Sequence, residues 1–384
     1  MTLTKNSQQS QAVQRFYVPL ALLYVVLPLP FDILLKQDVI AFPVTALIRG
    51  AIIALFILRA NLEVKAILAA LILVTEVALV LLLKNTGGSY GLPYLVVKIV
   101  AIVCLGTLFS NVLHRQLAVK IIKYFLVVYS LNVLLVLSGV IFNIDTFALA
   151  DSDRFGYTGL LPSAGNEAAI LLIILFTAIF VNNTKRKFLD LTRFNSRLVF
   201  FCIFLSCSLS GSKIATLYPF LMIMLWYFRF KTLWLFITIA CSAILSAYWF
   251  AQELSEVFAY LVRYYNEKGL VSMLFADRIS NILEVDLEIS AHNLMIGAAT
   301  QVTNLEMDIL TTYFNLGFLS LLIIVTMFYR IAIFWPRDRI SLFYVSTIIF
   351  CSFFVGHVFE SGFLIVPLVA LTFILRSIDA KPRT

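Results

Sequence analysis

The chain has 384 residues, of which 61% are hydrophobic and only 13% charged, and its formal net charge is +8. Soluble globular domains contain roughly 45–50% apolar and about 25% charged residues, so a water-exposed surface for a chain of this length cannot be built from these residues. The composition excludes a soluble enzyme or a nucleic-acid-binding module and indicates a chain that folds in lipid. We expect the excess of basic residues to report membrane orientation.

Apolar runs follow one another along the chain. A membrane-spanning helix needs about 20 mainly apolar residues, and runs of this kind lie at 16–35, 39–58, 62–83, 91–110, 117–142, 166–181, 198–211, 213–228, 232–251, 306–328, 341–356 and 361–375. They predict an all-α, polytopic transmembrane bundle of about twelve spans in one integral membrane domain, residues 1–384. The short seventh and eighth runs meet at Ser210-Gly211-Ser212-Lys213, which predicts a tight helical hairpin or two broken helices.

The basic residues predict the orientation. Lys5 and Arg15 precede a first run that lacks a small-residue cleavage site, so we expect it to remain as an uncleaved span. With both termini in the cytoplasm, 20 of the 29 Lys and Arg residues lie inside and seven outside. Because cytoplasmic loops collect Lys and Arg, this bias predicts a multi-pass membrane protein with both termini in the cytoplasm.

Two external segments are long enough to carry a site, 143–165 and 252–305. In the larger one, apolar residues from Leu254 to Tyr265 recur at helical spacing, with Gly269 as a stop, and a second helical stretch is expected from Ser272 to Leu283. The prediction is a partly helical external loop with amphipathic helices at the membrane surface. The cytoplasmic loops are short and lack a Gly-rich phosphate loop, which argues against an ATP-driven machine.

The few Lys and Arg residues that are predicted to lie outside are candidates for binding an anionic substrate. Arg154 stands in Asp151-Ser152-Asp153-Arg154-Phe155-Gly156-Tyr157, and Arg278 in Ala276-Asp277-Arg278-Ile279-Ser280-Asn281. A guanidinium is always charged and can hold phosphate through two parallel hydrogen bonds, so two or three such cations could hold a pyrophosphate. The alternative is that each Arg pairs with its neighbouring aspartate. Arg263 and Lys213 are weaker candidates for the same role.

Three external groups could accept a proton from a sugar hydroxyl. His292, in Ser290-Ala291-His292-Asn293-Leu294, is favoured because imidazole titrates near neutral pH, and Glu360 and Glu288 are held in reserve. The alternative for His292 is a loop histidine that hydrogen-bonds backbone. The five cysteines lie in apolar runs without a metal-site motif, so we expect packing roles and no metal. Glu76, Lys98 and Arg49 are expected to form a charge cluster within the membrane, with a proton pathway as the functional alternative.

The order of several motifs resembles the O-antigen polymerase and ligase superfamily of bacterial surface-polysaccharide assembly. These motifs are the Ser210-Gly211-Ser212-Lys213 turn that opens a span, His292-Asn293 late in the large external loop, and Tyr313-Phe314-Asn315-Leu316-Gly317 in the following span. The interval from Arg154 to Gly165 also fits the Arg-x10-Gly spacing of some polymerases. The sequence departs from the family where Lys213 replaces a frequent Arg, and where Ile289 stands eleven places after Arg278.

The resemblance implies a membrane glycosyltransferase, without a cofactor, that polymerises undecaprenyl-pyrophosphate-linked oligosaccharide repeat units of O-antigen or capsule type. Its partners would be a lipid-linked glycan donor, a lipid-linked acceptor, membrane lipid and a chain-length regulator. Arg154 and Arg278, helped by Arg263 and Lys213, would hold the pyrophosphate, and His292, Glu360 or Glu288 would act as the base. Two alternatives stay open. One is an O-antigen ligase that transfers glycan to lipid A core, and the other is a flippase or transporter for the lipid-linked oligosaccharide.

Overall fold

The computed structural model describes residues 115–142, 156–159, 165–185, 187–227, 290–297, 308–332, 338–356 and 362–379, and the single residues Ala51, Ile144, Phe147, Pro336 and Val358. The regular elements in this part of the chain are α-helices, as the apolar runs predict. They are α6 (Arg115–Phe142), α7 (Gly165–Thr184), α8 (Arg193–Leu209), α9 (Lys213–Tyr227), α13 (Ala291–Ile296), α14 (Asp308–Ala332), α15 (Arg339–Phe354) and α16 (Gly362–Asp379).

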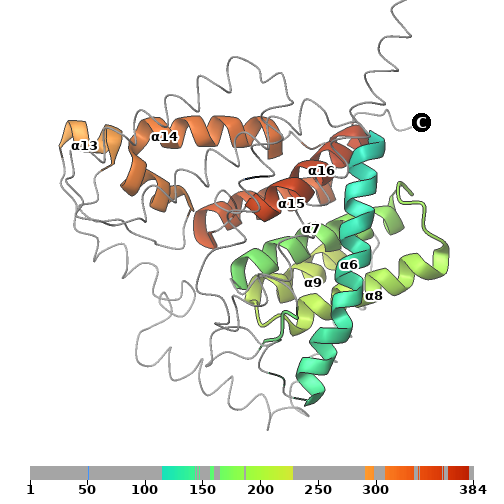
Figure 1. Ribbon diagram of the computed structural model, residues 1–384. Coiled ribbons are helices and arrows are strands. Elements are labelled where there is room, and N and C mark those ends of the chain that lie inside the picture. Colours follow the sequence, from blue (N-terminus) through green and yellow to red (C-terminus); the bar gives the residue numbers. More distant parts are fainter. Residues whose placement is uncertain are drawn as a thin grey trace, which may run out of the picture.

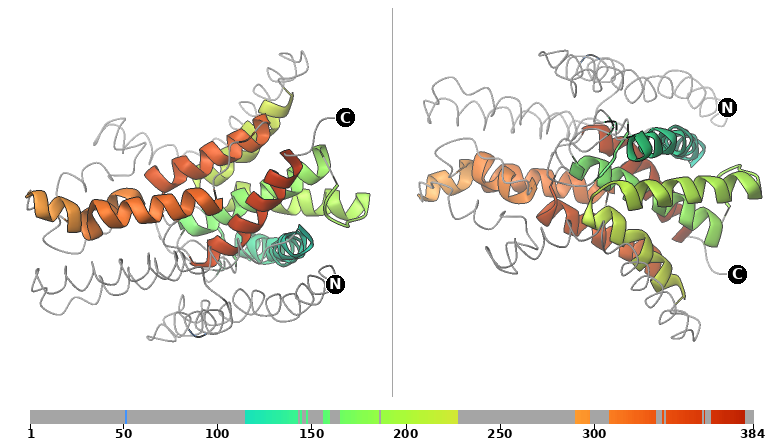
Figure 2. Two further views of the ribbon diagram at one scale, coloured as in Figure 1. Left: turned by 90° about the horizontal axis from the view of Figure 1, so that it is seen from above. Right: turned by 90° about the horizontal axis from the view of Figure 1, so that it is seen from below.

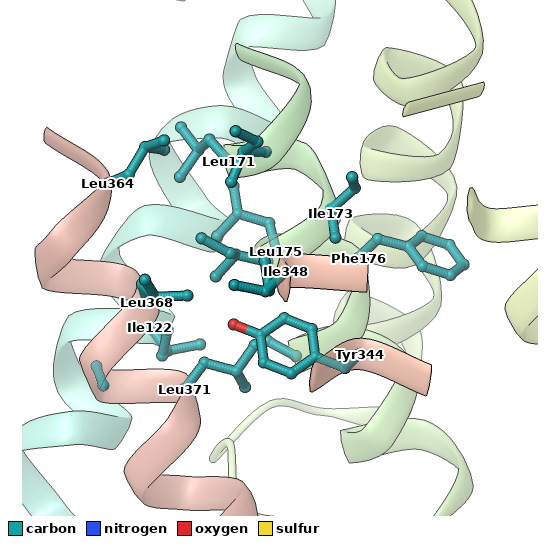
Figure 3. Close-up of a cluster of buried hydrophobic side chains, with 14 of the residues drawn as sticks. Ile122, Leu171, Ile173, Leu175, Phe176, Tyr344, Ile348, Leu364, Leu368 and Leu371 are labelled. Atoms are coloured by element: carbon teal, nitrogen blue, oxygen red, sulfur yellow. The ribbon is translucent and has the colours of Figure 1, made fainter. Parts of the chain in front are cut away.

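Helix α7 is the centre of the bundle. It packs against α6, α8, α9, α15 and α16, and every residue from Ala168 to Val181 is buried. Figure 3 shows how its side chains, among them Leu171 and Leu175, meet Ile348 of α15 and Leu368 of α16. A helix that is apolar around its whole circumference is buried on all sides, and α7 has no polar face to turn outward.

The surrounding helices expose apolar side chains on the sides that face away from α7. Leu131 and Leu134 on α6, Phe201 on α8 and Leu217 on α9 are all more than half exposed. A soluble protein rarely leaves so many large apolar side chains in water. In a membrane protein these faces contact lipid tails, because lipid is as apolar as the side chains.

Among the described residues, three helices are long and apolar enough to cross a membrane: Arg115–Phe142, Asn166–Thr184 and Ile309–Thr326. Three shorter apolar helices lie at Lys213–Tyr227, Arg339–Phe354 and Leu364–Ile378. Together with α8, the described helices coincide with seven of the predicted runs. The runs at 16–35, 39–58, 62–83, 91–110 and 232–251 lie outside the described residues, as do Arg49, Glu76 and Lys98, so the number of spans and the charge cluster stay predictions.

The short seventh and eighth runs form a helical hairpin, which confirms the first of the two predicted arrangements. α8 and α9 pack against each other and are joined by Ser210, Gly211 and Ser212. α8 begins at Arg193, before the predicted start at residue 198, because the Thr192 hydroxyl accepts from the Asn195 amide and caps the helix. α6 crosses in front of α7 and α8 (Figure 1).

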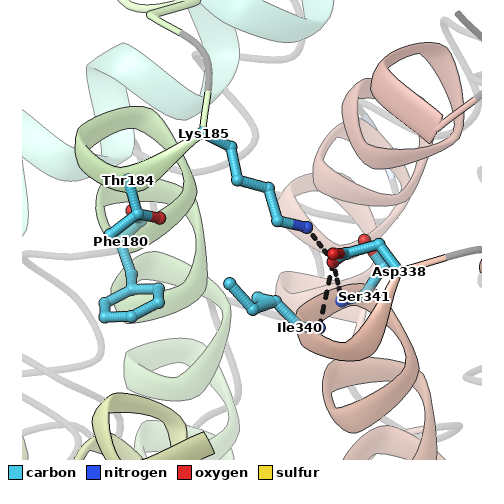
Figure 4. A network of polar contacts seen from close by, with 6 residues as sticks. All are labelled: Phe180, Thr184, Lys185, Asp338, Ile340 and Ser341. Atoms are coloured by element: carbon cyan, nitrogen blue, oxygen red, sulfur yellow. Dashed lines mark hydrogen bonds and ion pairs between the residues drawn. The ribbon is translucent and has the colours of Figure 1, made fainter. Parts of the chain in front are cut away.

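Contacts at the inner end of the bundle join segments that the charge bias assigns to the same side. Lys185, after α7, pairs with Asp338, which caps α15 by accepting from the amides of Ile340 at 2.9 Å and Ser341 at 3.2 Å (Figure 4). The Lys123 ammonium of α6 donates to the Asp190 carbonyl at 3.1 Å. These segments therefore share one end of the bundle, and we call it the inner end because the charge bias predicts that it faces the cytoplasm. We call the opposite end, where α6 ends at Phe142 and α7 begins at Gly165, the outer end.

Asp338 holds α15 in two ways, as helix cap and as partner of Lys185, and substitution separates them. Asp338→Ala removes both and is expected to lower the free energy of unfolding by about 1–2 kcal/mol. Asp338→Asn keeps a capping acceptor and loses only the charge of this largely buried pair, so a smaller loss than that of Asp338→Ala is expected. Thermal unfolding of the two variants in detergent measures the difference, and equal losses would contradict the capping role.

Candidate functional site

The α8–α9 turn lies below the outer end of α7. The Cys207 thiol, three residues before the turn, donates to the Leu172 carbonyl at 4.0 Å, and the hydroxyls of Tyr218 and Thr177 share a hydrogen bond of 2.7 Å. Leu172 is the seventh residue after Gly165. At 1.5 Å per helical residue, the turn lies roughly 6–10 Å inside the outer end of α7.

The turn satisfies its own backbone with small polar side chains. The Ser210 hydroxyl donates to the Cys207 carbonyl at 2.9 Å, and the Thr216 hydroxyl donates to the same carbonyl at 3.2 Å. Gly211 has a φ of 72°, in the left-handed region that favours glycine. α9 then starts with the bond from the Thr216 amide to the Ser212 carbonyl at 2.9 Å. This chemistry explains why Ser-Gly-Ser separates two helices here.

A short non-helical segment, Gly156–Gly159, lies against this turn, and we call it the strap. The Tyr157 amide donates to the Leu209 carbonyl at 2.8 Å, which satisfies an acceptor that the end of α8 leaves free. The amides of Thr158 and Gly159 donate to the Phe147 carbonyl at 2.9 Å and 3.1 Å. The strap is thus bonded to α8 on one edge and to the chain after α6 on the other.

The strap and the turn meet backbone to backbone. A Cβ on Gly156 would lie 2.7 Å from the Gly211 Cα and 2.8 Å from the Ser210 carbonyl oxygen. Separations below 3.0 Å exclude a side chain unless the backbone shifts, so glycine at position 156 permits the approach. The polar stretch that carries Arg154 is therefore tied, two residues later, to the turn that precedes Lys213.

Irregular backbone at membrane depth is tolerated where protein buries it or where it lines a water-filled cavity. The strap and the α8–α9 turn are both irregular, and Gly156, Thr158, Gly159 and Ser210 are buried. They lie within a bundle whose outward faces are apolar. An arrangement of this kind concentrates polar groups in a low-dielectric surrounding, where a charge interacts more strongly than it does in water.

Lys213 is the predicted site residue that the structure describes with its side chain. It is the first residue of α9 and is exposed. The start of α9 carries the positive end of the helix dipole, which favours an anion. Arg154, Arg263, Arg278, Glu288 and Glu360 lie outside the described residues.

The backbone of His292 lies in a different part of the structure from the α8–α9 turn. Sequence analysis expects a loop there, whereas the structure has the short helix α13, because the Ser290 hydroxyl accepts from the Asn293 amide at 3.1 Å and Gly297 ends the helix with a φ of 114°. α13 packs on α14, and a Cβ on Gly297 would lie 2.4 Å from the Asn315 carbonyl oxygen. Figures 1 and 2 both show α13 well apart from the α8–α9 turn.

The Tyr313-to-Gly317 motif marks a break in α14. Gly317 has a φ of 79° and a ψ of −179°, which interrupts the helix and requires glycine. Thr311, Thr312 and Asn315 are buried just before the break, and the Thr312 hydroxyl is among the buried groups without a hydrogen-bond partner. The structure therefore joins His292-Asn293 to the Tyr313-to-Gly317 motif and joins the strap to the Ser210-to-Lys213 motif. It leaves these two pairs apart.

Sequence analysis missed three features of the site, namely Asn132, the strap and the close approach of Gly156. Asn132 is a buried amide in the middle of an apolar helix, and its isolated polarity could have marked it. Within the part of the chain that the structure describes, no three His, Cys, Asp or Glu side chains gather as a metal site would require. Cys207 and Cys351 are buried in the hydrophobic core, in agreement with packing roles.

Comparisons of the chain with protein-family models, with curated proteins and with solved structures give no match.

The close approach of Gly156 can be tested by adding one methyl group. Gly156→Ala should displace the strap from the turn, because the new Cβ meets backbone atoms that cannot rotate away, and we expect a loss of about 1–3 kcal/mol of stability. Ser208→Ala is the matched control, since the Ser208 hydroxyl bonds only within α8, to the Phe204 carbonyl at 3.0 Å. Thermal unfolding in detergent compares the two, and a Gly156→Ala protein as stable as the control would contradict the contact.

Proposed function

We propose that this chain is an integral membrane glycosyltransferase that polymerises oligosaccharide repeat units carried on undecaprenyl pyrophosphate. In this proposal it has twelve spans, both termini lie in the cytoplasm, and the reaction takes place at the outer face of the bacterial inner membrane. The observation that carries it is the contact of Gly156 with Gly211, which ties the Arg154 stretch to the start of α9.

The reaction needs positive charge at the position of the leaving group. When the acceptor hydroxyl attacks the donor sugar, the bond to the carrier breaks and negative charge grows on the departing pyrophosphate. Fixed cations and amide dipoles stabilise that charge most strongly in a site that excludes water. The turn lies about 6–10 Å inside the outer end of α7, where the surrounding helices are apolar on their outward faces.

Arg154 and Lys213 are the proposed core of the pyrophosphate site. Arg154 precedes the strap residue Gly156 by two positions, a reach of at most about 7 Å along the chain. Lys213 follows the turn directly and begins α9. The amides of the first turn of α9 add the positive end of a helix dipole, and Arg278 and Arg263 are proposed to complete the set of cations.

The base is proposed to be His292, with Glu360 and Glu288 as the other candidates. A base has to stand within hydrogen-bond reach of the hydroxyl that attacks beside the pyrophosphate. Because α13 lies apart from the α8–α9 turn (Figure 1), a role for His292 requires the two places to approach each other when donor and acceptor bind. The cation site and the base are therefore tested separately.

Removal of either cation should abolish chain growth. With purified protein, lipid-linked repeat unit and no lipid A core, Arg154→Ala and Lys213→Ala should lower the rate of polymer formation roughly 10²-fold or more. Lys187→Ala removes an exposed cation on the inner side and should have no effect. Polymer formed without lipid A core excludes a ligase or a pure transporter, whereas normal polymer from both cation variants would refute the site.

Substitution identifies the base. His292→Ala should lower the rate by roughly 10²–10⁴-fold, because a positioned base contributes that much to proton transfer. The acidic limb of the pH–rate profile should disappear with it, since imidazole accepts a proton only when neutral. If His292→Ala keeps the wild-type rate and pH–rate profile, His292 is not the base. The base is then the carboxylate, Glu360 or Glu288, whose substitution by Gln lowers the rate.

A further inference from the structure

Asn132 is a buried amide in the middle of a membrane-spanning helix. Its neighbours Leu131 and Val133 are apolar, and it lies ten residues before the end of α6 at Phe142, about 15 Å below that end at 1.5 Å per residue. A polar side chain at such depth is costly unless it is hydrogen-bonded, and in membrane proteins it commonly marks a functional place.

The Asn132 side chain holds the strap from the α6 side. Its Nδ2 donates to the Thr158 carbonyl at 3.0 Å, across 26 residues of chain. The Thr158 amide is bonded to Phe147, and the preceding residue, Tyr157, is bonded to Leu209 of α8. Asn132 thus completes a set of bonds that fixes the strap between two helices.

The packing around Asn132 allows the strap little freedom. A Cβ on Gly159 would lie 2.4 Å from the Asn132 Oδ1, and one on Gly139, two turns further along α6, would lie 2.5 Å from the Tyr157 Cδ1. Gly159 also has a φ of 61°, which favours glycine. The amide therefore sets both the position and the register of the strap along α6.

We propose that Asn132 is a positioning residue, which holds the strap against the α8–α9 turn and so fixes, at the turn that precedes Lys213, the point of the chain two residues after Arg154. It acts on the pyrophosphate through the strap and makes no contact with the substrate. The identity of the ligand rests on the proposed function, whereas the anchoring of the strap does not.

Amide hydrogen exchange in detergent tests the anchoring without any substrate. In the wild-type protein the amides of Tyr157, Thr158 and Gly159 should be protected from exchange. Asn132→Leu, which keeps the number of side-chain heavy atoms and removes the donor, should speed their exchange roughly tenfold. Asn132→Ala removes the donor without adding volume and should give the same result if the leucine variant does not fold.

Leu126→Ala is the matched control for general loosening of α6. Leu126 is buried in the core two turns below Asn132, so its truncation should lower the melting temperature and leave exchange in the strap unchanged. Unprotected strap amides in the wild type, unchanged exchange in both Asn132 variants, or equally fast exchange in Leu126→Ala would each overturn the anchoring.

A double-mutant cycle tests the link to Arg154. Asn132→Leu should lower the rate of polymer formation roughly tenfold, mainly through kcat, because a misplaced cation stabilises the transition state less. In the Arg154→Ala background the same substitution should have almost no further effect, since the group that it positions is gone. If the rate loss of the double variant equals the product of the two single losses, Asn132 acts independently of Arg154 and has only a structural role. If the wild type makes no polymer, the proposed function fails and hydrogen exchange still decides whether Asn132 anchors the strap.

Discussion

Backbone polar groups within a membrane have to find partners inside the protein, because lipid offers none. Helices meet this constraint within themselves, but the α8–α9 turn and the strap cannot. The bond from the Tyr157 amide to the Leu209 carbonyl, at 2.8 Å, satisfies both at once. Since the last residue of α8, directly before the turn, supplies the acceptor for the strap, the two irregular segments lie against each other at this depth.

Helix α7 supports the α8–α9 turn from the centre of the bundle. α7 is enclosed by five helices and carries no site residue among the predicted ones. It serves as the fixed core against which α8 and α9 set the depth of their turn, through the contacts of Cys207 with Leu172 and of Tyr218 with Thr177. A site supported by an enclosed helix keeps its geometry, which a reaction that stabilises charge by pre-positioned groups requires.

The two glycine-containing motifs that carry the family resemblance correspond to two backbone conformations. Gly211, with a φ of 72°, is the middle residue of the connection between α8 and α9, and Gly317, with a φ of 79°, breaks α14. Both values are costly for residues with a Cβ. The motifs therefore mark interruptions of helices at membrane depth, and each interruption has a second segment packed on it, the strap in one case and α13 in the other. Their order in the sequence did not indicate that they belong to separate places in the bundle.

The sequence by itself determined the helical class, the apolar helices that the structure describes and the break between α8 and α9, because about 20 apolar residues in a row have one stable conformation in lipid and Ser-Gly-Ser interrupts it. The structure decided that the two helices on either side of this break form a hairpin. The tertiary structure alone decided that α7 is enclosed while α6 exposes Leu131 and Leu134. Lipid-facing and protein-facing positions are equally apolar, so hydropathy cannot tell them apart. It also decided the place of the strap, since pairing between backbone groups such as Tyr157 and Leu209 leaves no signature in the side chains. Whether Arg154 and Lys213 can bind the same ligand therefore depends on contacts between segments that are far apart in the chain.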